Sequence, residues 1–393
     1  MRNLLIGVVA GIVIGIAVGT SAIAPRLQSR MPVAQETVRL EMPPMPPPEP
    51  TPVSTPAPIQ PTNTQIRSPE NSVSWRMASA FGSAMPHLGS MAKRVEDNMR
   101  EISGGSFRIM FHEPGALVPP LEMLDAVRSG AIEAAYSSPA FWADKFPALQ
   151  LFASIPFGPP AKEYLGWLYE GGGYKIFQDI YRKNGLHGLV CGFSTRGASG
   201  WMRQPIRSLK DFNGLTLRAT GLAAKVMERI GAATTVLAGG DMRIAFDKGM
   251  IDGGVFSQPA ADMSLGLERK AEYYYFPGWQ QSSALYGLMI NLDSWNALPP
   301  VQRTRIETVC GDNVRYGLAE GEAGQFTALK RMTALGIEIK QLPPTVLSAL
   351  KNAWAEVAVE ESNKDRQFAL AWTSLNRFHE EYSIWSELSE PRP

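Results

Sequence analysis

An arginine ends a short alternating segment, NGLTLRATG, at residues 213–221. If this segment is a strand, Leu215 and Leu217 share one face and Arg218 points to the other, because side chains alternate along a pleat. A planar guanidinium offers two parallel N–H donors that match a carboxylate, a geometry that lysine cannot reproduce. Arg218 is therefore a candidate anion-binding residue, with a structural ion pair and a solvent-exposed position as the alternatives.

Two short motifs resemble enzyme signatures without completing them. Ser90 and Lys93 match the S-x-x-K motif of penicillin-binding proteins, but the chain lacks the S-D-N and K-T-G motifs of that class. Both residues also fit the surface of an amphipathic helix. His112 and Glu113 begin an H-E-x-x-H zinc motif, which Pro114 interrupts. An anchored serine enzyme is a remote alternative, and we expect no catalytic residues, no metal and no cofactor.

The two cysteines, Cys191 and Cys310, lie far apart and match no metal-ligand spacing. They form either one disulfide or two buried thiols. Cys191 lies in the apolar run LVCGF, and free cysteine is among the most buried residue types. The pattern therefore favours two buried thiols.

Length and net charge set only broad limits. At 393 residues the chain has room for one large domain or two to three ordinary ones. It contains 38 Lys+Arg against 37 Asp+Glu, a formal net charge of +1. A protein with this balance has no general attraction to nucleic acid, and none is expected as a partner.

The N-terminal segment differs in composition from the rest. Residues 4–24 are apolar apart from one threonine and one serine, which is long enough to cross a membrane as a helix. Glycines repeat every fourth residue from Gly7 to Gly19, and Pro25 disfavours cleavage after Ala24. These features favour an uncleaved anchor over a signal peptide. The proline-dominated stretch that follows, residues 42–69, predicts an extended linker.

Short apolar strands alternate with amphipathic helices from residue 73 onward. Residues 74–138 read as three strands with two helices between them, and a similar order recurs at residues 187–256. Such βαβ units predict an α/β fold with parallel sheets, whose ligands bind beyond the carboxyl ends of the strands. The C-terminal third is mostly helical, and one long helix after Pro300 is expected to span both halves.

Five stretches resemble the extracytoplasmic solute-binding proteins of TRAP (tripartite ATP-independent periplasmic) transporters, in particular those that bind 2-oxo acids and other small organic acids. They are LDAVRSGAIEAAYSS at residues 124–138, FASIPFGPP at 152–160, SLKDFNGLTLRATG at 208–221, GGDMRIAFDKGMIDG at 239–253 and AEYYYFPGW at 271–279. They follow the family's order from residue 124 to residue 279, within a resemblance that extends over most of residues 73–390. The resemblance therefore rests on the whole body of the chain and not on a single motif.

The resemblance implies two α/β domains, joined by crossing strands and a long helix, that close on a ligand held between them. It also implies that Arg218, at the end of a strand in the second domain, forms a paired salt bridge with the carboxylate of the ligand.

The resemblance implies further contacts in the cleft. These candidate ligand-binding residues are Arg196, Trp201, Phe256, Gln258, Arg243, Phe141 and Trp279. For Arg196 the alternative is a solvent-exposed turn. For Phe141 and its neighbour Trp142, and for Trp279 and Gln280, the alternative is a position in the core.

The sequence departs from the family pattern at three places. Family members that bind 2-oxo acids often carry Glu-Trp where this chain has Val255 and Phe256, and some use the Glu to hold a cation beside the ligand. Valine cannot bind a hard cation, so a metal-assisted site is not expected. Ala116 likewise replaces a common Glu. Arg243 replaces an uncharged residue and would favour a dianionic ligand if its side chain pointed inward.

The resemblance predicts a periplasmic solute-binding protein, tethered to the inner membrane, that delivers a small organic acid to the integral membrane subunits of a TRAP transporter. A sensor that reports ligand to a membrane partner is the alternative. The predicted domains are a membrane anchor or signal segment at 1–30, a proline-rich linker at 31–71, a first α/β domain at 72–195 plus 284–323, and a second α/β domain with the C-terminal helices at 196–283 plus 324–393.

Overall fold

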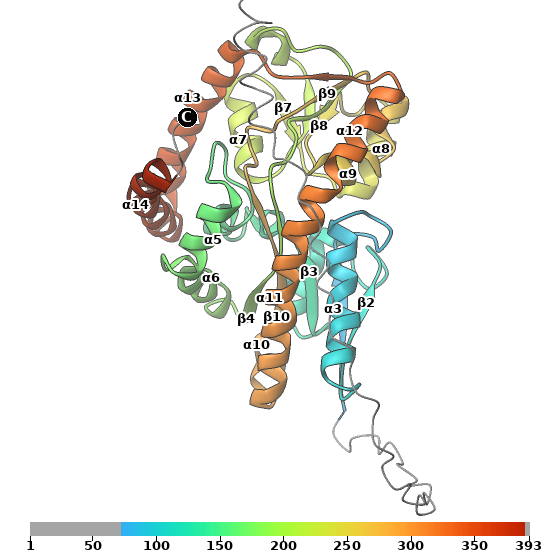
Figure 1. Cartoon of the computed structure of the whole chain (residues 1–393), viewed down its shortest axis with the longest axis vertical. Helices are drawn as coiled ribbons and strands as arrows, with labels where there is room; N and C mark the ends of the chain where they lie inside the picture. The colour runs from blue at the N-terminus through green and yellow to red at the C-terminus, as the bar shows by residue number, and fades with distance from the viewer. Residues whose placement is uncertain (1–71, 390–393) are drawn as a thin grey trace, which may run out of the picture. The chain divides into compact units, whose positions relative to one another are not determined.

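The computed structural model describes residues 72–389, in which two α/β lobes are each built around one sheet (Figure 1). The predicted membrane anchor, residues 1–30, and the proline-rich linker, residues 31–71, lie outside the described residues. Within residues 72–389, no helix has both the length and the apolar character needed to cross a membrane.

Five strands form the sheet of the first lobe, in the order β2-β1-β3-β10-β4. Strand β1 is parallel to β2 and β3, whereas β10 runs antiparallel to β3 and β4. The expectation of a parallel sheet is therefore wrong at β10, because this strand enters the sheet directly from the second lobe. The strands are β1 Val73–Ser79, β2 Phe107–His112, β3 Ala134–Ser137, β4 Leu186–Ser194 and β10 Ala284–Asn291.

Helix α3, Leu88–Ile102, illustrates how the apolar pattern produces the helices of this lobe. Met91, Val95 and Met99 recur at helical spacing, and all three are fully buried, as the sequence predicts. Gly104 adopts a positive φ of 58° just beyond the helix, a conformation that ends it at low steric cost. The other helical segments of this lobe are η2 Pro120–Glu122, α4 Met123–Arg128, η3 Pro139–Trp142, η4 Pro147–Phe152, α5 Ala161–Tyr169, α6 Gly173–Arg182 and α10 Leu292–Asn296.

Six strands form the sheet of the second lobe, in the order β11-β9-β5-β8-β6-β7. Strand β5 is antiparallel to both β8 and β9, while β6 is parallel to β7 and β8. Like β10, β5 follows a crossing from the other lobe. The strands are β5 Gly200–Met202, β6 Thr216–Arg218, β7 Ala233–Thr235, β8 Gly253–Gly254, β9 Tyr273–Tyr275 and β11 Glu338–Lys340, and the helices are η5 Leu209–Phe212, α7 Gly221–Arg229, α8 Gly239–Asp247, α9 Pro259–Met263 and η6 Leu267–Arg269.

Two consecutive helices connect the lobes where the sequence predicts one. Helix α11, Pro300–Ala323, packs against β4 and α3, and α12, Gln325–Ala334, packs against α9 of the second lobe (Figure 1). They are separated at Gly324.

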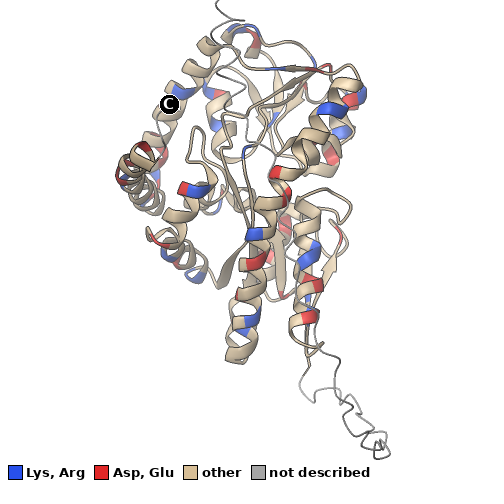
Figure 2. Ribbon diagram, in the orientation of Figure 1, with Lys and Arg blue, Asp and Glu red and all other residues tan. Residues whose placement is uncertain are grey.

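Charged residues of both signs are interspersed along α3 and α11, as Figure 2 shows. Arg94 of α3 and Asp312 of α11 pair at 2.7 Å across this contact.

The last two helices bridge the lobes a second time. Helix α13, Pro344–Lys364, packs against α7, where Lys225 pairs with the buried carboxylate of Glu361. Helix α14, Arg366–Ser389, packs against α5, α6 and η4 of the first lobe. The predicted domain bounds instead place residues 366–389 in the second domain.

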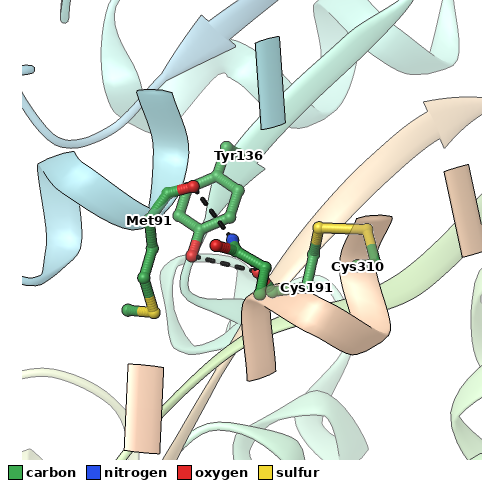
Figure 3. The surroundings of a disulfide bond; sticks show 5 residues. Met91, Tyr136, Cys191 and Cys310 are labelled. Atoms are coloured by element: carbon green, nitrogen blue, oxygen red, sulfur yellow. Dashed lines mark hydrogen bonds between the residues drawn. A yellow bond between two sulfur atoms is a disulfide. The ribbon is translucent and has the colours of Figure 1, made fainter. Parts of the chain in front are cut away.

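A disulfide joins Cys191 of β4 to Cys310 of α11, so the preference for two buried thiols is wrong (Figure 3). Both residues are buried, as expected, but helix packing brings them together across 119 residues of chain. The amide of Asn313 donates to the carbonyl oxygens of Cys191 at 2.6 Å and Met91 at 2.9 Å. The disulfide and these two hydrogen bonds together hold α11 against the sheet of the first lobe.

Candidate functional site

A small cavity lies where the carboxyl ends of strands from both sheets meet. Its volume is about 50 Å³, which limits its contents to a few heavy atoms. The lining residues come from the first lobe (Phe81, Leu88, Ser138, Ala140, Phe141, Ala153, Ser154), from the second (Arg218, Thr220, Phe256) and from the segment that returns to the first (Gln281, Ala284, Tyr286). This is the position at which α/β sheets bind their ligands.

Among residues 72–389, Arg218 is the one charged residue that lines this cavity. It is the last residue of β6, its side chain opposes the face of the fully buried Leu217, and it is only 3% exposed. Its Nε and Nη2 donate to the carbonyl of Leu237 at 3.0 and 2.9 Å, and its Nη1 donates to the carbonyl of Val255 at 2.6 Å. A guanidinium has five N–H donors, so one on Nη1 and one on Nη2 remain without a partner among the described residues.

Nη1 and Nη2 form the end of the guanidinium that suits two-point binding of a carboxylate, and each retains one N–H donor among the described contacts. The backbone carbonyls of Leu237 and Val255 hold the group in one orientation before any ligand arrives. Burial lowers the pKa of Arg218 to about 10, and the attraction of Asp262 opposes this effect. Arg218 therefore keeps its positive charge at neutral pH. The ring of Phe256 lies 5.3 Å from the guanidinium carbon and adds a cation–π contact.

The amino end of α7 adds a second feature that favours an anion. Thr220, its N-cap residue, lines the cavity and makes no side-chain capping hydrogen bond. The first residue of the helix, Gly221, has a φ of +58°, which lets the chain turn sharply after β6. The free N–H groups and the dipole at a helix amino end attract negative charge. Arg218 and α7 thus present positive charge and partial positive charge to the same cavity.

Sequence reasoning missed the polar residues that β10 and its preceding loop contribute. Tyr286 lines the cavity, its Oη lies 3.4 Å from Ser257 Oγ, and burial raises its pKa, so it remains a hydrogen-bond donor. Gln281 also lines the cavity and donates to Ser194 Oγ at 3.1 Å. Tyr286 lies in the run ALYGLMIN, which reads as an ordinary buried strand. Only the crossing of the chain between the lobes, just before β10, could have indicated that Gln281 and Tyr286 line the cavity.

Asp262 of α9 is the buried carboxylate behind Arg218. It is fully buried, accepts from the backbone N–H of Ser257 at 2.8 Å and accepts from the hydroxyl of Tyr274 at 2.8 Å. Burial raises the pKa of Asp262 to about 7, although both hydrogen bonds and the charge of Arg218 lower it. Asp262 carries a negative charge on only part of the molecules at neutral pH.

The raised pKa of Asp262 predicts how stability depends on pH. The folded protein holds this proton up to about pH 7, whereas the unfolded chain loses it near the ordinary aspartate pKa of 3.8. The free energy of unfolding should therefore fall as pH rises from 5 to 8, with a contribution from Asp262 of about 2–3 kcal/mol. Asp262→Asn should remove this contribution and Asp252→Asn should not, as measured by denaturant unfolding at each pH. Equal slopes in wild type and Asp262→Asn would contradict the assignment.

Three of the predicted ligand-binding residues line the cavity: Arg218, Phe256 and Phe141. Phe141, with Ala140, also borders an adjoining groove of about 470 Å³ between η3 and α7. The groove and the cavity therefore share Ala140 and Phe141 in their linings. Trp142 lines the groove but not the cavity.

Two of the other predicted residues are exposed and lie outside the lining of the cavity. Arg196 is exposed and donates to the carbonyl of Gly278 at 3.4 Å, as the alternative of a turn position predicts. Arg243 is exposed on α8 and lies 3.6 Å from Asp247. Its side chain does not point inward, so it gives no support for a dianionic ligand.

The remaining three predicted residues are buried and also lie outside the lining. Trp201 packs on Tyr274 at 4.7 Å between ring centroids, inside the core of the second lobe. Gln258 donates to Thr195 Oγ1 at 2.9 Å near the crossing between lobes. Trp279 packs on Phe157 at 5.7 Å.

The S-x-x-K motif is not assembled as a catalytic pair. Ser90 Oγ lies 2.8 and 2.9 Å from the carboxylate oxygens of Glu320 and 3.1 Å from the carbonyl of His87. Lys93 pairs with Glu96 on its own helix. Both residues have structural partners on or beside α3.

The residues around Arg218 do not fit a cation. Val255 and Phe256 offer no side-chain ligand, and the carbonyl oxygen of Val255 already accepts from Arg218. The two carboxylate oxygens of Asp262 already accept hydrogen bonds from the backbone N–H of Ser257 and the hydroxyl of Tyr274. Residues 72–389 contain no group of three or more His, Cys, Asp or Glu side chains placed to hold a metal ion. A hard cation needs several oxygen ligands, which this arrangement does not supply.

Comparisons with known proteins agree with this architecture. Residues 63–365 match the family described as bacterial extracellular solute-binding protein, family 7 (DctP). A monocarboxylate 2-oxoacid-binding periplasmic protein of Nostoc sp. is 31% identical over 332 residues, which are 84% of this chain and 90% of that protein.

Solved structures show the same fold. A TRAP transporter solute-binding protein from Bordetella bronchiseptica, with calcium and picolinate bound, is 29% identical with a TM-score of 0.79 and is matched over 81% of this chain and 94% of its own. One from Colwellia psychrerythraea, with calcium and pyruvate bound, is 25% identical with a TM-score of 0.77 and is matched over 81% and 97%. These matches confirm the predicted two-lobe α/β fold. The chain belongs to family 7 of the bacterial extracellular solute-binding proteins, the DctP family, as the resemblance to TRAP solute-binding proteins predicts.

Proposed function

We propose that this protein binds a small monocarboxylate at Arg218 and presents it to the membrane subunits of a TRAP-type transporter. The observation that carries the proposal is the guanidinium of Arg218, which is buried and held by two backbone carbonyls. Each of its terminal nitrogens keeps one N–H without a partner among residues 72–389. The amino end of α7 and the hydroxyl of Tyr286 supply further donors around the same cavity.

The proposed ligand class follows from the size and charge of the cavity. A volume of about 50 Å³ and a single lining cation suit one carboxylate with a short substituent. One relative is a monocarboxylate 2-oxoacid-binding protein, and solved structures of two others hold picolinate and pyruvate. We infer that 2-oxo acids are the first candidates for this chain, with Tyr286 placed to donate to the 2-oxo group. The adjoining groove would admit the acid before the lobes close over it.

The proposed location is the periplasm, with the N-terminal segment as the tether to the inner membrane. Two observations support an extracytoplasmic site of action. The family is extracellular, and the chain carries a disulfide, which persists in oxidising compartments. Neither observation favours the alternatives of a sensor or a serine enzyme.

A thermal-shift screen of the full chain tests the proposal. The panel contains 2-oxo acids, hydroxy acids, dicarboxylates, sugar acids and aromatic acids, with Arg218→Ala in parallel. We expect a stabilising shift from one or more monocarboxylates that disappears in the variant. A shift from uncharged compounds only, or the same shift in the variant, would contradict the proposal.

Ligand binding is expected to be independent of divalent and alkali cations. Because the residues around Arg218 do not fit a cation, the dissociation constant for pyruvate should stay within about twofold in EDTA, calcium or sodium, measured by calorimetry at constant ionic strength. A loss of binding in EDTA that calcium restores would show that a cation takes part.

A further inference from the structure

We propose that Asp262 balances the charge of Arg218 in the empty site and takes up one proton from solvent when a carboxylate binds. This inference rests on the proposed function. Unlike the predicted ligand-binding residues, Asp262 does not line the cavity and is given no direct contact with the ligand. Asp262 acts on the ligand through Arg218 and through the loop that precedes α9.

Asp262 is tied to the site by a short chain of contacts. Its carboxylate accepts from the backbone N–H of Ser257, in the loop that also contains Val255 and Phe256. Val255 in turn accepts from Nη1 of Arg218 at 2.6 Å and donates its own N–H to the carbonyl of Arg218 at 2.9 Å. The ring of Phe256 lines the cavity. Asp262 is therefore a positioning residue for the loop that orients the guanidinium.

Charge balance provides the argument for proton uptake. Without ligand and above about pH 7, where Asp262 is mostly ionised, the buried guanidinium of Arg218 and the fully buried carboxylate of Asp262 attract each other and their charges sum to zero. A bound carboxylate adds a second negative charge to the same buried region. An uncompensated charge in a protein interior is strongly unfavourable, so protonation of Asp262 lets the ligand carboxylate become the counter-ion of Arg218.

The surroundings of Asp262 can accommodate its neutral form. Tyr274 Oη lies 2.8 Å from one carboxylate oxygen and can accept the hydrogen bond of a protonated Asp262 instead of donating. The backbone N–H of Ser257 remains bonded to the other oxygen. Protonation therefore leaves both carboxyl oxygens with a partner, while the buried hydroxyl of Tyr274 gives up Asp262 as its acceptor.

Few charged groups compete with this arrangement among the described residues. The titratable side chains that act on Asp262 or on Arg218 beside it are Tyr274 of β9, Arg218 of β6 and Tyr286 of β10. Helices α12 and η6, which pack against α9, carry Lys330, Arg331, Glu268 and Arg269, and none of these contributes to the pKa of Asp262.

Calorimetry of pyruvate binding to the full chain tests the inference. Pyruvate stays ionised between pH 5.5 and 8.5, so its own titration does not interfere. Affinity should weaken about 10- to 30-fold from pH 6 to 8.5, because ionised Asp262 must first be protonated. Titrations at pH 8 in phosphate and in Tris, whose heats of ionisation differ, should show uptake of close to one proton per ligand, and almost none at pH 5.5.

Two variants separate the proposed role from a structural one. Asp262→Asn should bind pyruvate with little dependence on pH and with no proton uptake at pH 8. Asp252→Asn, which removes a half-buried carboxylate that accepts from the backbone N–H of Thr216, should behave like wild type. The wild-type proton count alone decides the question if Asp262→Asn fails to fold.

The outcomes that overturn the inference differ from those that overturn the proposed function. Pyruvate binding by wild type without proton uptake at pH 8, or an unchanged pH dependence in Asp262→Asn, would refute the role of Asp262 while leaving the carboxylate site intact. No binding of pyruvate at any pH would contradict the choice of 2-oxo acids as ligands and would refute the inference with it.

Discussion

Arg218→Ala is expected to weaken carboxylate binding by about 2–5 kcal/mol, or roughly 30-fold to several thousand-fold in the dissociation constant. The reason is that the closed site buries the ligand's charge, and Arg218 is the only cationic side chain that the described residues place in the lining of the cavity. Calorimetry with the tightest-binding acid of the screen measures the effect directly.

Arg218→Lys distinguishes two-point binding from simple charge attraction. Lysine keeps the positive charge but cannot donate both to the backbone carbonyls of Leu237 and Val255 and to two oxygens of a ligand. We therefore expect most of the affinity to be lost in this variant as well. Near-normal affinity of Arg218→Lys would contradict the proposed geometry.

Two other arginines serve as matched controls. Arg196→Ala and Arg243→Ala each remove one positive charge from the second lobe, but both side chains are exposed and lie outside the cavity lining. The dissociation constants of these two variants for the same acid should remain within about threefold of the wild-type value, because exposed charges act weakly across solvent. A large loss in either variant would show that the lobes close into a different arrangement.

Reduction of the Cys191–Cys310 disulfide is expected to lower the free energy of unfolding by about 3–5 kcal/mol. The bond closes a loop of 119 residues, and releasing so long a loop increases the conformational freedom of the unfolded chain substantially. Guanidinium chloride unfolding with and without a thiol reductant measures the difference.

The double variant Cys191→Ala/Cys310→Ala checks that the effect belongs to the bond. It should match the reduced wild-type protein to within about 1–2 kcal/mol, the difference arising from lost packing of two buried sulfur atoms. The variant should also be insensitive to reductant. Wild-type protein that unfolds at the same denaturant concentration in both conditions would contradict the expected contribution.

Much of the framework could be predicted because it depends on local pattern. Met91, Val95 and Met99 placed α3 correctly, and alternation placed Arg218 at the end of a strand opposite a buried leucine. The antiparallel direction of β5 and β10 could not be predicted, because local pattern does not record from which lobe a strand arrives. The disulfide could not be predicted for a similar reason, since a buried thiol and a buried half-cystine have the same local sequence.

The site was predictable only in part. Arg218, Phe256 and Phe141 were found through family position, and they line the cavity. The same approach named Trp201, which instead packs inside a core, because position along a strand does not reveal which face meets the ligand. Tyr286 and Asp262 were missed because one resembles an ordinary strand residue and the other acts only through its burial beside Arg218.

The most direct test of the central claim is a crystal structure of the protein with pyruvate, or with the tightest-binding acid of the screen. We predict a carboxylate in the cavity between the lobes, with its two oxygens about 3 Å from Nη1 and Nη2 of Arg218 and no metal ion beside it. A ligand whose carboxylate lies elsewhere, or reaches Arg218 only through a cation, would contradict the account.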